Sequence, residues 1–271
     1  MRRWLGKGWD MTVRHKYVGV LLFLYRLLWG FFLFRLVDSV VTPVLARYPD
    51  LHPNANAIPL FLIEAEFRLL RTDLLDPLLW LLAGLLLFRM IVSPLINAGL
   101  YYSFRHSEEE KSGTRMLAGI RQAWKPVVLL YWLENALALL PAVWLLPMAK
   151  DRFFSAGSPG SWIRELLPYA AGWLIWGFVV HVLFQCLQFG AVSREGFGKA
   201  LMQALSRALP LLAVSLAMAG IGAAASAAVS SVSLLWSGFI AVALHQAFHF
   251  VRTLLSLWTA ASQFAVWRGN E

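Results

Sequence analysis

The sequence has little charge and almost no cysteine. Charged residues make up 14% of the 271 positions, against about 25% in an ordinary soluble domain. The one cysteine, Cys186, has no second thiol in the chain to pair with. The shortage of charge excludes a soluble enzyme and a disordered tail, and the lone cysteine excludes a small secreted protein held together by disulfides.

Apolar side chains are abundant instead. Hydrophobic residues account for 59% of the chain, which includes thirteen Trp and eighteen Phe. A water-facing globule of this length cannot bury so much apolar surface. We therefore predict an all-α integral membrane protein, formed by a single polytopic domain over residues 1–271.

Six apolar stretches are long enough to cross a bilayer, which takes about 20 mostly apolar residues. They lie at about 17–44, 77–104, 126–148, 166–192, 209–229 and 238–267. The last two form one apolar run, in which Ser230-Ser231 and Ser237-Gly238 indicate a turn. The sequence thus predicts a six-transmembrane-helix bundle.

Basic residues set the expected orientation, because loops rich in Lys and Arg stay in the cytoplasm. Most of them fall in the N-terminal segment, the second and fourth connections and the C-terminal tail: Arg2, Arg3, Lys7, Arg14, Lys16, Arg105, Lys111, Arg115, Arg121, Lys125, Arg194, Lys199, Arg207 and Arg268. We expect a multi-pass protein of the cell membrane with both termini cytoplasmic. In layout the chain resembles six-helix membrane proteins of unknown function from Gram-positive bacteria, which implies a bacterial source and no residue roles.

Three further segments have the pattern of amphipathic helices at the membrane surface. One follows the first predicted span at 59–75, and the others precede the third and fifth spans at 113–124 and 198–209. The latter two align at an offset of 85 residues, and each is followed by a proline, Pro126 or Pro210. They suggest a repeated unit of one surface helix and two spans, although basic amphipathic segments also arise before spans independently.

Ionisable residues inside spans are costly and mark candidate functional sites. Glu134 lies about 12 Å into the third span, at 1.5 Å per residue. Arg26 lies at a similar depth in the first span, so we expect it to pair with Glu134, with Arg89 as the second choice. The pair would form either a proton- or ion-coupled carboxylate or a buried ion pair that fixes helix packing.

Two spans carry polar residues at helical spacing. The stripe on the sixth span consists of His245, His249, Arg252, Ser256, Thr259 and Gln263, and the stripe on the fourth consists of His181, Gln185 and Gln188. Facing each other, they would enclose a polar path, or they would join the helices by hydrogen bonds. His245 and His249 also have the spacing of metal ligands, with His181 as the third, although the glutamate of the zinc-protease pattern is missing.

The fifth span has a small-residue stripe of Gly220, Ala224 and Ala228, which would let another helix approach closely. We expect it to pack against the sixth span, a membrane-protein partner or a second copy of the chain. The sequence has no phosphate-binding glycine loop and no nucleophile elbow, and its basic residues are too dispersed for a nucleic-acid face. It therefore predicts no cofactor and no nucleic-acid partner; the basic loops would face anionic lipid headgroups.

Three functions remain open. The first is a subunit, chaperone or regulator of a membrane complex that performs no chemistry of its own. The second is a small transporter or channel-like subunit with a polar path between the fourth and sixth spans. The third is a metal-dependent intramembrane enzyme.

Overall fold

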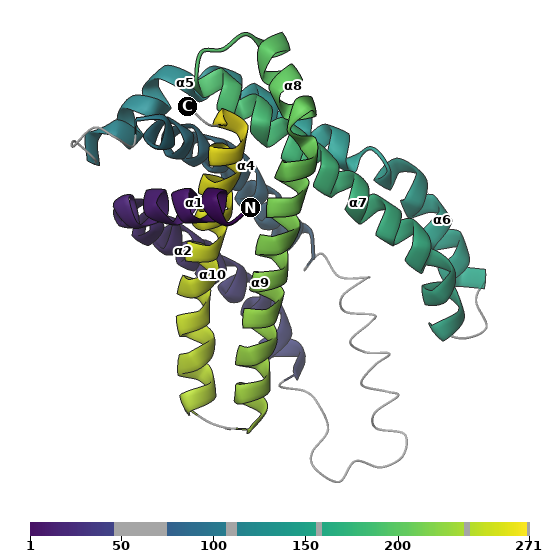
Figure 1. The fold of residues 1–271 in the computed structure, drawn as a ribbon. Coiled ribbons are helices and arrows are strands. Elements are labelled where there is room, and N and C mark those ends of the chain that lie inside the picture. Colours follow the sequence, from purple (N-terminus) through teal and green to yellow (C-terminus); the bar gives the residue numbers. More distant parts are fainter. Residues whose placement is uncertain (46–74, 107–112, 156–158, 236–238, 270–271) are drawn as a thin grey trace, which may run out of the picture. The chain divides into compact units, whose positions relative to one another are not determined.

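A computed structural model describes residues 1–45, 75–106, 113–155, 159–235 and 239–269. In these ranges the chain is helical and contains no strand, which confirms the all-α prediction for them (Figure 1). The helices are α1 (Arg2–Arg14), α2 (Lys16–Leu45), α4 (Leu75–Arg105), α5 (Gly113–Leu139), α6 (Ala142–Ser155), α7 (Pro159–Val192), α8 (Phe197–Ser206), α9 (Ala208–Leu235) and α10 (Phe239–Arg268). The amphipathic helix predicted at 59–75 lies outside the described residues except for Leu75, where α4 begins.

Among the described residues, five helical stretches are long and apolar enough to cross a membrane. They are Lys16–Ser39, Leu79–Arg105, Arg115–Asp151, Arg164–Val192 and Ala208–Ser233, and they match the first five predicted spans. The sixth predicted span corresponds to α10, which has 30 residues but is not among the five. The structure therefore fits an α-helical membrane protein.

The third predicted span is not one helix. It breaks at Leu140 and Pro141 into α5 and α6. Pro141 has no N–H to donate to the carbonyl of Leu137, so the helix cannot continue its regular bonding there. Two indoles of α7 donate to the last turn of α5 instead: Trp176 Nε1 to Leu137 O at 3.0 Å and Trp173 Nε1 to Ala138 O at 2.7 Å.

The turn between the last two spans also differs in part from the prediction. Ser230 and Ser231 are helical residues of α9, which continues to Leu235. The second predicted turn position, Ser237-Gly238, falls between α9 and α10, outside the described residues. Serine does not by itself end a helix, because its hydroxyl can donate a hydrogen bond to a carbonyl of the same helix. Ser233 Oγ donates to Ser230 O in this way.

The chain forms two compact units. Residues 20–92 make the smaller unit, in which the Arg89 guanidinium lies 5.4 Å from the ring centre of Trp29. The larger unit consists of residues 1–19 and 93–271. It contains all of α5 to α10, together with α1 and the C-terminal end of α4.

In the larger unit, three amphipathic segments pack against the C-terminal ends of long helices. At each contact a glycine lets the backbones approach, because a Cβ there would overlap the neighbour. Gly8 of α1 lies against Ser262 of α10, Gly99 of α4 against Met116 of α5, and Gly190 of α7 against Ala200 of α8. Two of these segments, in α5 and α8, were predicted from the sequence as amphipathic surface helices. For α1 only the basic residues of the N-terminal segment were recognised.

The two segments that align at an offset of 85 residues join their spans differently. The first segment and its span form one helix, α5, with Pro126 inside it. The second segment, α8, ends before Arg207, and α9 starts after it. Arg207 holds this junction to the end of α10 by donating hydrogen bonds to the carbonyls of Val266 (3.2 Å) and Trp267.

The core of the larger unit lies where the C-terminal ends of α4, α7 and α10 meet. Phe189 is its centre: its ring centroid is 4.7 Å from that of Tyr101 and 5.3 Å from that of Phe264. Phe104 and Trp267 complete the group and are almost fully buried. These aromatic contacts hold the C-terminal end of α7 against α4 and α10.

Candidate functional site

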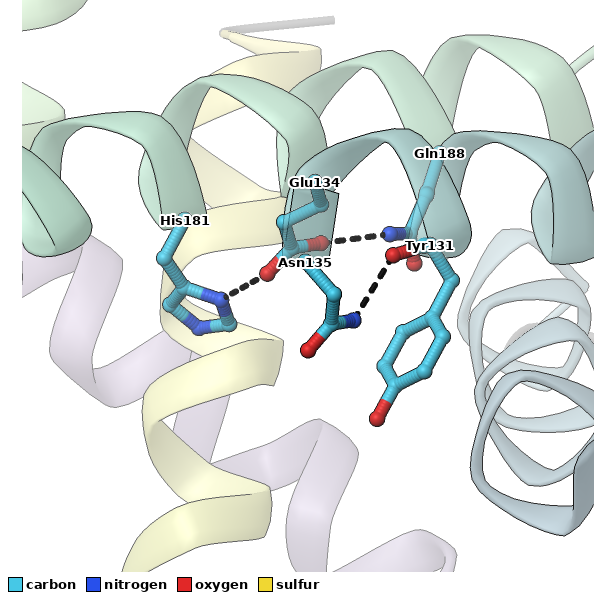
Figure 2. Close-up of polar contacts among 5 residues, drawn as sticks. All are labelled: Tyr131, Glu134, Asn135, His181 and Gln188. Atoms are coloured by element: carbon cyan, nitrogen blue, oxygen red, sulfur yellow. Dashed lines mark hydrogen bonds and ion pairs between the residues drawn. The ribbon is translucent and has the colours of Figure 1, made fainter. Parts of the chain in front are cut away.

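Glu134 is the polar centre of the α5–α7 contact. It lies on α5, is 9% exposed and accepts two hydrogen bonds from α7 (Figure 2). His181 Nδ1 lies 2.6 Å from Glu134 Oε1, and Gln188 Nε2 donates to Glu134 Oε2 at 3.0 Å. His181 and Gln188 are seven residues apart, two helical turns, so both reach the same carboxylate from one face of α7.

The Glu134–His181 pair has a buried end and an open end. The Glu134 side chain is 11% exposed, whereas the His181 side chain is 58% exposed. The short distance between Nδ1 and Oε1 is typical of a charge-assisted hydrogen bond. In this geometry Nδ1 faces the carboxylate, and Nε2 lies on the other side of the ring.

Further polar groups line the buried end. Gln185 is buried on the same face of α7, and its amide lies beside the Tyr101 hydroxyl of α4. Tyr101 is also close enough to Glu134 to interact with it electrostatically. Asn135 turns away from the carboxylate and donates to the Tyr131 carbonyl of its own helix at 2.7 Å (Figure 2).

The described partners of Glu134 are therefore on α7, whereas the sequence analysis expected Arg26 or Arg89. Depth along separate spans cannot reveal which helices become neighbours; α5 and α7, separated in the chain by α6, pack together. Arg26 is on α2 and Arg89 is on α4, and both belong to the unit of residues 20–92. A pairing of either arginine with Glu134 stays a prediction.

Among the described side chains, the fourth-span stripe bonds to Glu134 of α5 and to Tyr101 of α4. On α10, Gln263 instead donates to Ser215 Oγ of α9 at 2.8 Å, and His249 and Arg252 are exposed. His245 lies on α10, and its side chain is outside the described residues. Among the side chains that are described, no three His, Cys, Asp or Glu gather as metal ligands.

The small-residue stripe is exposed along about two turns of α9. Gly220, Ala224 and Ala228 are all exposed, and a Cβ at Gly220 would meet nothing within 4 Å. Gly222 has open space around it as well. All three residues are therefore exposed in the part of the chain that the structure describes, and packing of the stripe against α10, a partner or a second copy stays a prediction.

The hydrogen bonds of the cluster hold α5 to α7. Sequence reasoning missed Tyr101 as a neighbour of Glu134, since nothing in the pattern of α4 distinguishes this tyrosine from a core aromatic residue. It did identify Gln188 as part of a polar stripe on the fourth span, but only the fold shows that Gln188 bonds to the carboxylate of Glu134.

Comparison with known protein families, with curated proteins and with solved structures gives no match to this chain.

Proposed function

We propose that the chain is a six-span, multi-pass protein of the bacterial cell membrane with both termini cytoplasmic. At about 1.5 Å per residue, the 30 residues of α10 extend about 45 Å, enough for a sixth crossing. The N-terminal helix packs on the C-terminal half of α10, where Trp258 Nε1 donates to Leu5 O at 2.9 Å. This contact supports an even number of spans, because chain ends that pack together would lie on the same side of a membrane.

The surface helices fit this arrangement. Each of these surface helices packs some apolar side chains against a span and leaves other large ones exposed. Examples of the exposed ones are Trp9 on α1, Leu117 on α5 and Met202 on α8. Basic residues lie on the same helices, including Lys7, Arg121 and Lys199. A helix of this kind lies in the headgroup region, where anionic lipids attract its cations.

The function that the geometry supports best is that of a subunit, chaperone or regulator of a membrane complex without chemistry of its own. The observation that carries it is the exposed small-residue stripe on α9. Helices associate in lipid through close van der Waals contact, and Gly220, Ala224 and Ala228 permit such an approach. A partner helix, from another protein or from a second copy, would seat there.

Cross-linking from α9 in intact membranes tests this function. A photoreactive residue at Ala224 should give one discrete protein adduct, and the additional change Gly220→Leu should abolish it by blocking close approach. Ser226 is the control, because it is also exposed and lies about 200° around the same helix. Adducts that are the same from Ala224 and Ser226 would argue against a partner at the stripe.

A second function, a small transporter or channel-like subunit, is favoured by the Glu134 cluster. A buried carboxylate joined to an exposed imidazole is the kind of group through which an ion or proton moves. The polar path predicted between α7 and α10 would have His181 and Gln185 on one side and His249 and Arg252 on the other. Purified protein in vesicles should then support a proton or solute flux that Glu134→Gln stops; a wild-type flux no greater than that of empty vesicles contradicts this function.

A further inference from the structure

We infer that α1, α8 and the N-terminal segment of α5 form a collar whose exposed apolar sides enter one leaflet of the membrane and whose cations bind the phosphates of anionic lipids there. The collar consists of Arg2–Arg14, residues 113–125 and Phe197–Ser206. The inference rests on the six-span topology proposed above. It adds the side of each helix that faces lipid and the charge of the lipid that the helix binds.

The three collar segments occupy equivalent places in the fold. Each precedes a long stretch of helix in the chain and packs on the C-terminal end of another helix: α1 on α10, the α5 segment on α4, and α8 on α7. These three ends meet at the aromatic group around Phe189. His15, directly after α1, lies at the same group, with its ring centroid 6.0 Å from that of Phe104. The collar therefore lies at one end of the larger unit.

Arginines cap the three long helices at this end. Guanidinium groups donate hydrogen bonds to a carbonyl at the end of each: Arg115 to His106 after α4 (2.6 Å), Arg105 to Val192 of α7 (3.1 Å), and Arg207 to the last turn of α10. The partial negative charge of a helix C-terminus attracts cations in this way. An end rich in arginine is expected on the cytoplasmic side, where the leaflet contains anionic lipids.

Each collar segment has three sides that follow one another in the same rotational direction. At about 100° per residue, an exposed apolar side is centred about 100–120° round the helix from the packed side, and a basic side about 190–240° round in the same direction. The buried residues of the packed sides are Gly8 and Thr12 on α1, Met116, Gly119 and Ala123 on α5, and Ala200 and Ala204 on α8. The apolar sides, each residue 43–74% exposed, consist of Trp9 and Val13 on α1, Leu117 and Trp124 on α5, and Phe197, Met202 and Leu205 on α8. The basic sides consist of Arg3, Lys7 and Arg14, next to Asp10, on α1, Arg121 and Lys125 on α5, and Lys199, which also pairs with Glu195, on α8.

This shared order of sides matches a lipid surface. A helix that packs on a span, with its apolar side toward the acyl chains and its basic side outward, contacts acyl chains and phosphates together. One anionic leaflet satisfies all three segments at once, whereas a protein partner would have to complement three separate helices. On α5, Lys125 Nζ lies 5.8 Å from the ring centre of the exposed Trp124, which suits an indole at the headgroup level with a cation above it.

Spin labels on single cysteines, introduced into a Cys186→Ser background, test the placement. The protein is measured in vesicles of equal parts phosphatidylcholine and phosphatidylglycerol. Oxygen, which dissolves among acyl chains, should reach labels on the apolar sides in preference to a water-soluble nickel chelate, at positions Val13, Leu117 and Met202. The chelate should be preferred at the matched controls on the basic sides, Arg14, Arg121 and Lys199. Apolar-side labels that the chelate reaches equally well, or that neither reagent reaches because protein covers them, would overturn the inference.

Thermal unfolding of the protein with Cys186 intact tests the charge of the lipid. A thiol-reactive dye should report a higher Tm in the mixed vesicles than in pure phosphatidylcholine. Arg3→Gln, Arg14→Gln and Arg121→Gln should each reduce this difference by about 2–4 °C, whereas the Lys variants at these positions should keep it. Equal Tm values of the wild type in the two lipids, or the same loss with Lys as with Gln, would overturn the inference.

The topology on which the inference rests has its own readout. Tags on the two termini should be accessible from the same side of sealed vesicles. Tags on opposite sides would contradict the six-span topology and the collar together, whereas tags on the same side with equal Tm values in both lipids would contradict the collar alone.

Discussion

A methyl group added at Gly190 should loosen the contact between α7 and α8. Ala is favoured over Gly inside a helix by about 0.5–1 kcal/mol. At Gly190, however, the new methyl would overlap the Cβ of Ala200, and carbon atoms pack comfortably only at about 3.5–4 Å. Overpacking of this kind costs about 1–3 kcal/mol. Gly177, on the same helix, has nothing within 4 Å of an added Cβ, so Gly177→Ala is the matched control.

The helix-propensity gain is common to both variants, so the difference between them isolates the packing cost of about 1–3 kcal/mol. A free-energy change of 1 kcal/mol moves Tm by about 2–4 °C in chains of this size, so Gly190→Ala should melt about 2–12 °C below Gly177→Ala. Cys186 provides the assay, because the chain has no other cysteine and this one is 1% exposed. A dye that fluoresces on reaction with thiols will report unfolding during a temperature ramp. Equal Tm values for the two variants would refute the packing of α8 on α7.

Three other predictions concern contacts of the larger unit. Gly8→Leu should detach α1 from α10 and expose α1 to protease, whereas Gly6→Leu, in open space, should not; equal cleavage contradicts the contact. Gln263→Ala and Ser215→Ala should each lower stability by about 1 kcal/mol, and a double-mutant cycle in the thiol-dye assay should show coupling, which strict additivity would exclude. Arg207→Ala leaves the last carbonyls of α10 without their guanidinium donor, so amide hydrogen exchange should rise at the end of α10, and unchanged exchange would be evidence against this role.

Helix positions followed from the sequence because apolar length alone predicts spans. The match of Arg164–Val192 to the predicted 166–192 illustrates this. The break at Leu140 and Pro141 was missed because Pro126 and Pro168 lie within helices, so a proline by itself does not tell where a helix ends. What distinguishes Pro141 in the fold is that neighbouring indoles bond to the carbonyls of the last turn of α5.

The candidate site was predictable only in its components. Glu134 and His181 could be selected because ionisable groups in spans are rare, and the spacing of Gln185 and Gln188 placed them on the same face as His181. Periodicity assigns residues to a face of their own helix but does not identify the helix opposite. That information comes from the packing of α7 on α5, whereas the predicted partner, the α10 stripe, has Gln263 bonded to α9.

Native mass spectrometry of the protein, extracted from its own membrane in polymer-bounded lipid discs, tests the central claim that the chain works as part of a membrane complex. We predict a species heavier than the 30.5 kDa chain by the mass of a fixed number of partner or identical subunits, which Ala224→Leu converts to the single chain. A wild-type protein that is found only as a single chain of 30.5 kDa, with bound lipid alone, would contradict the account.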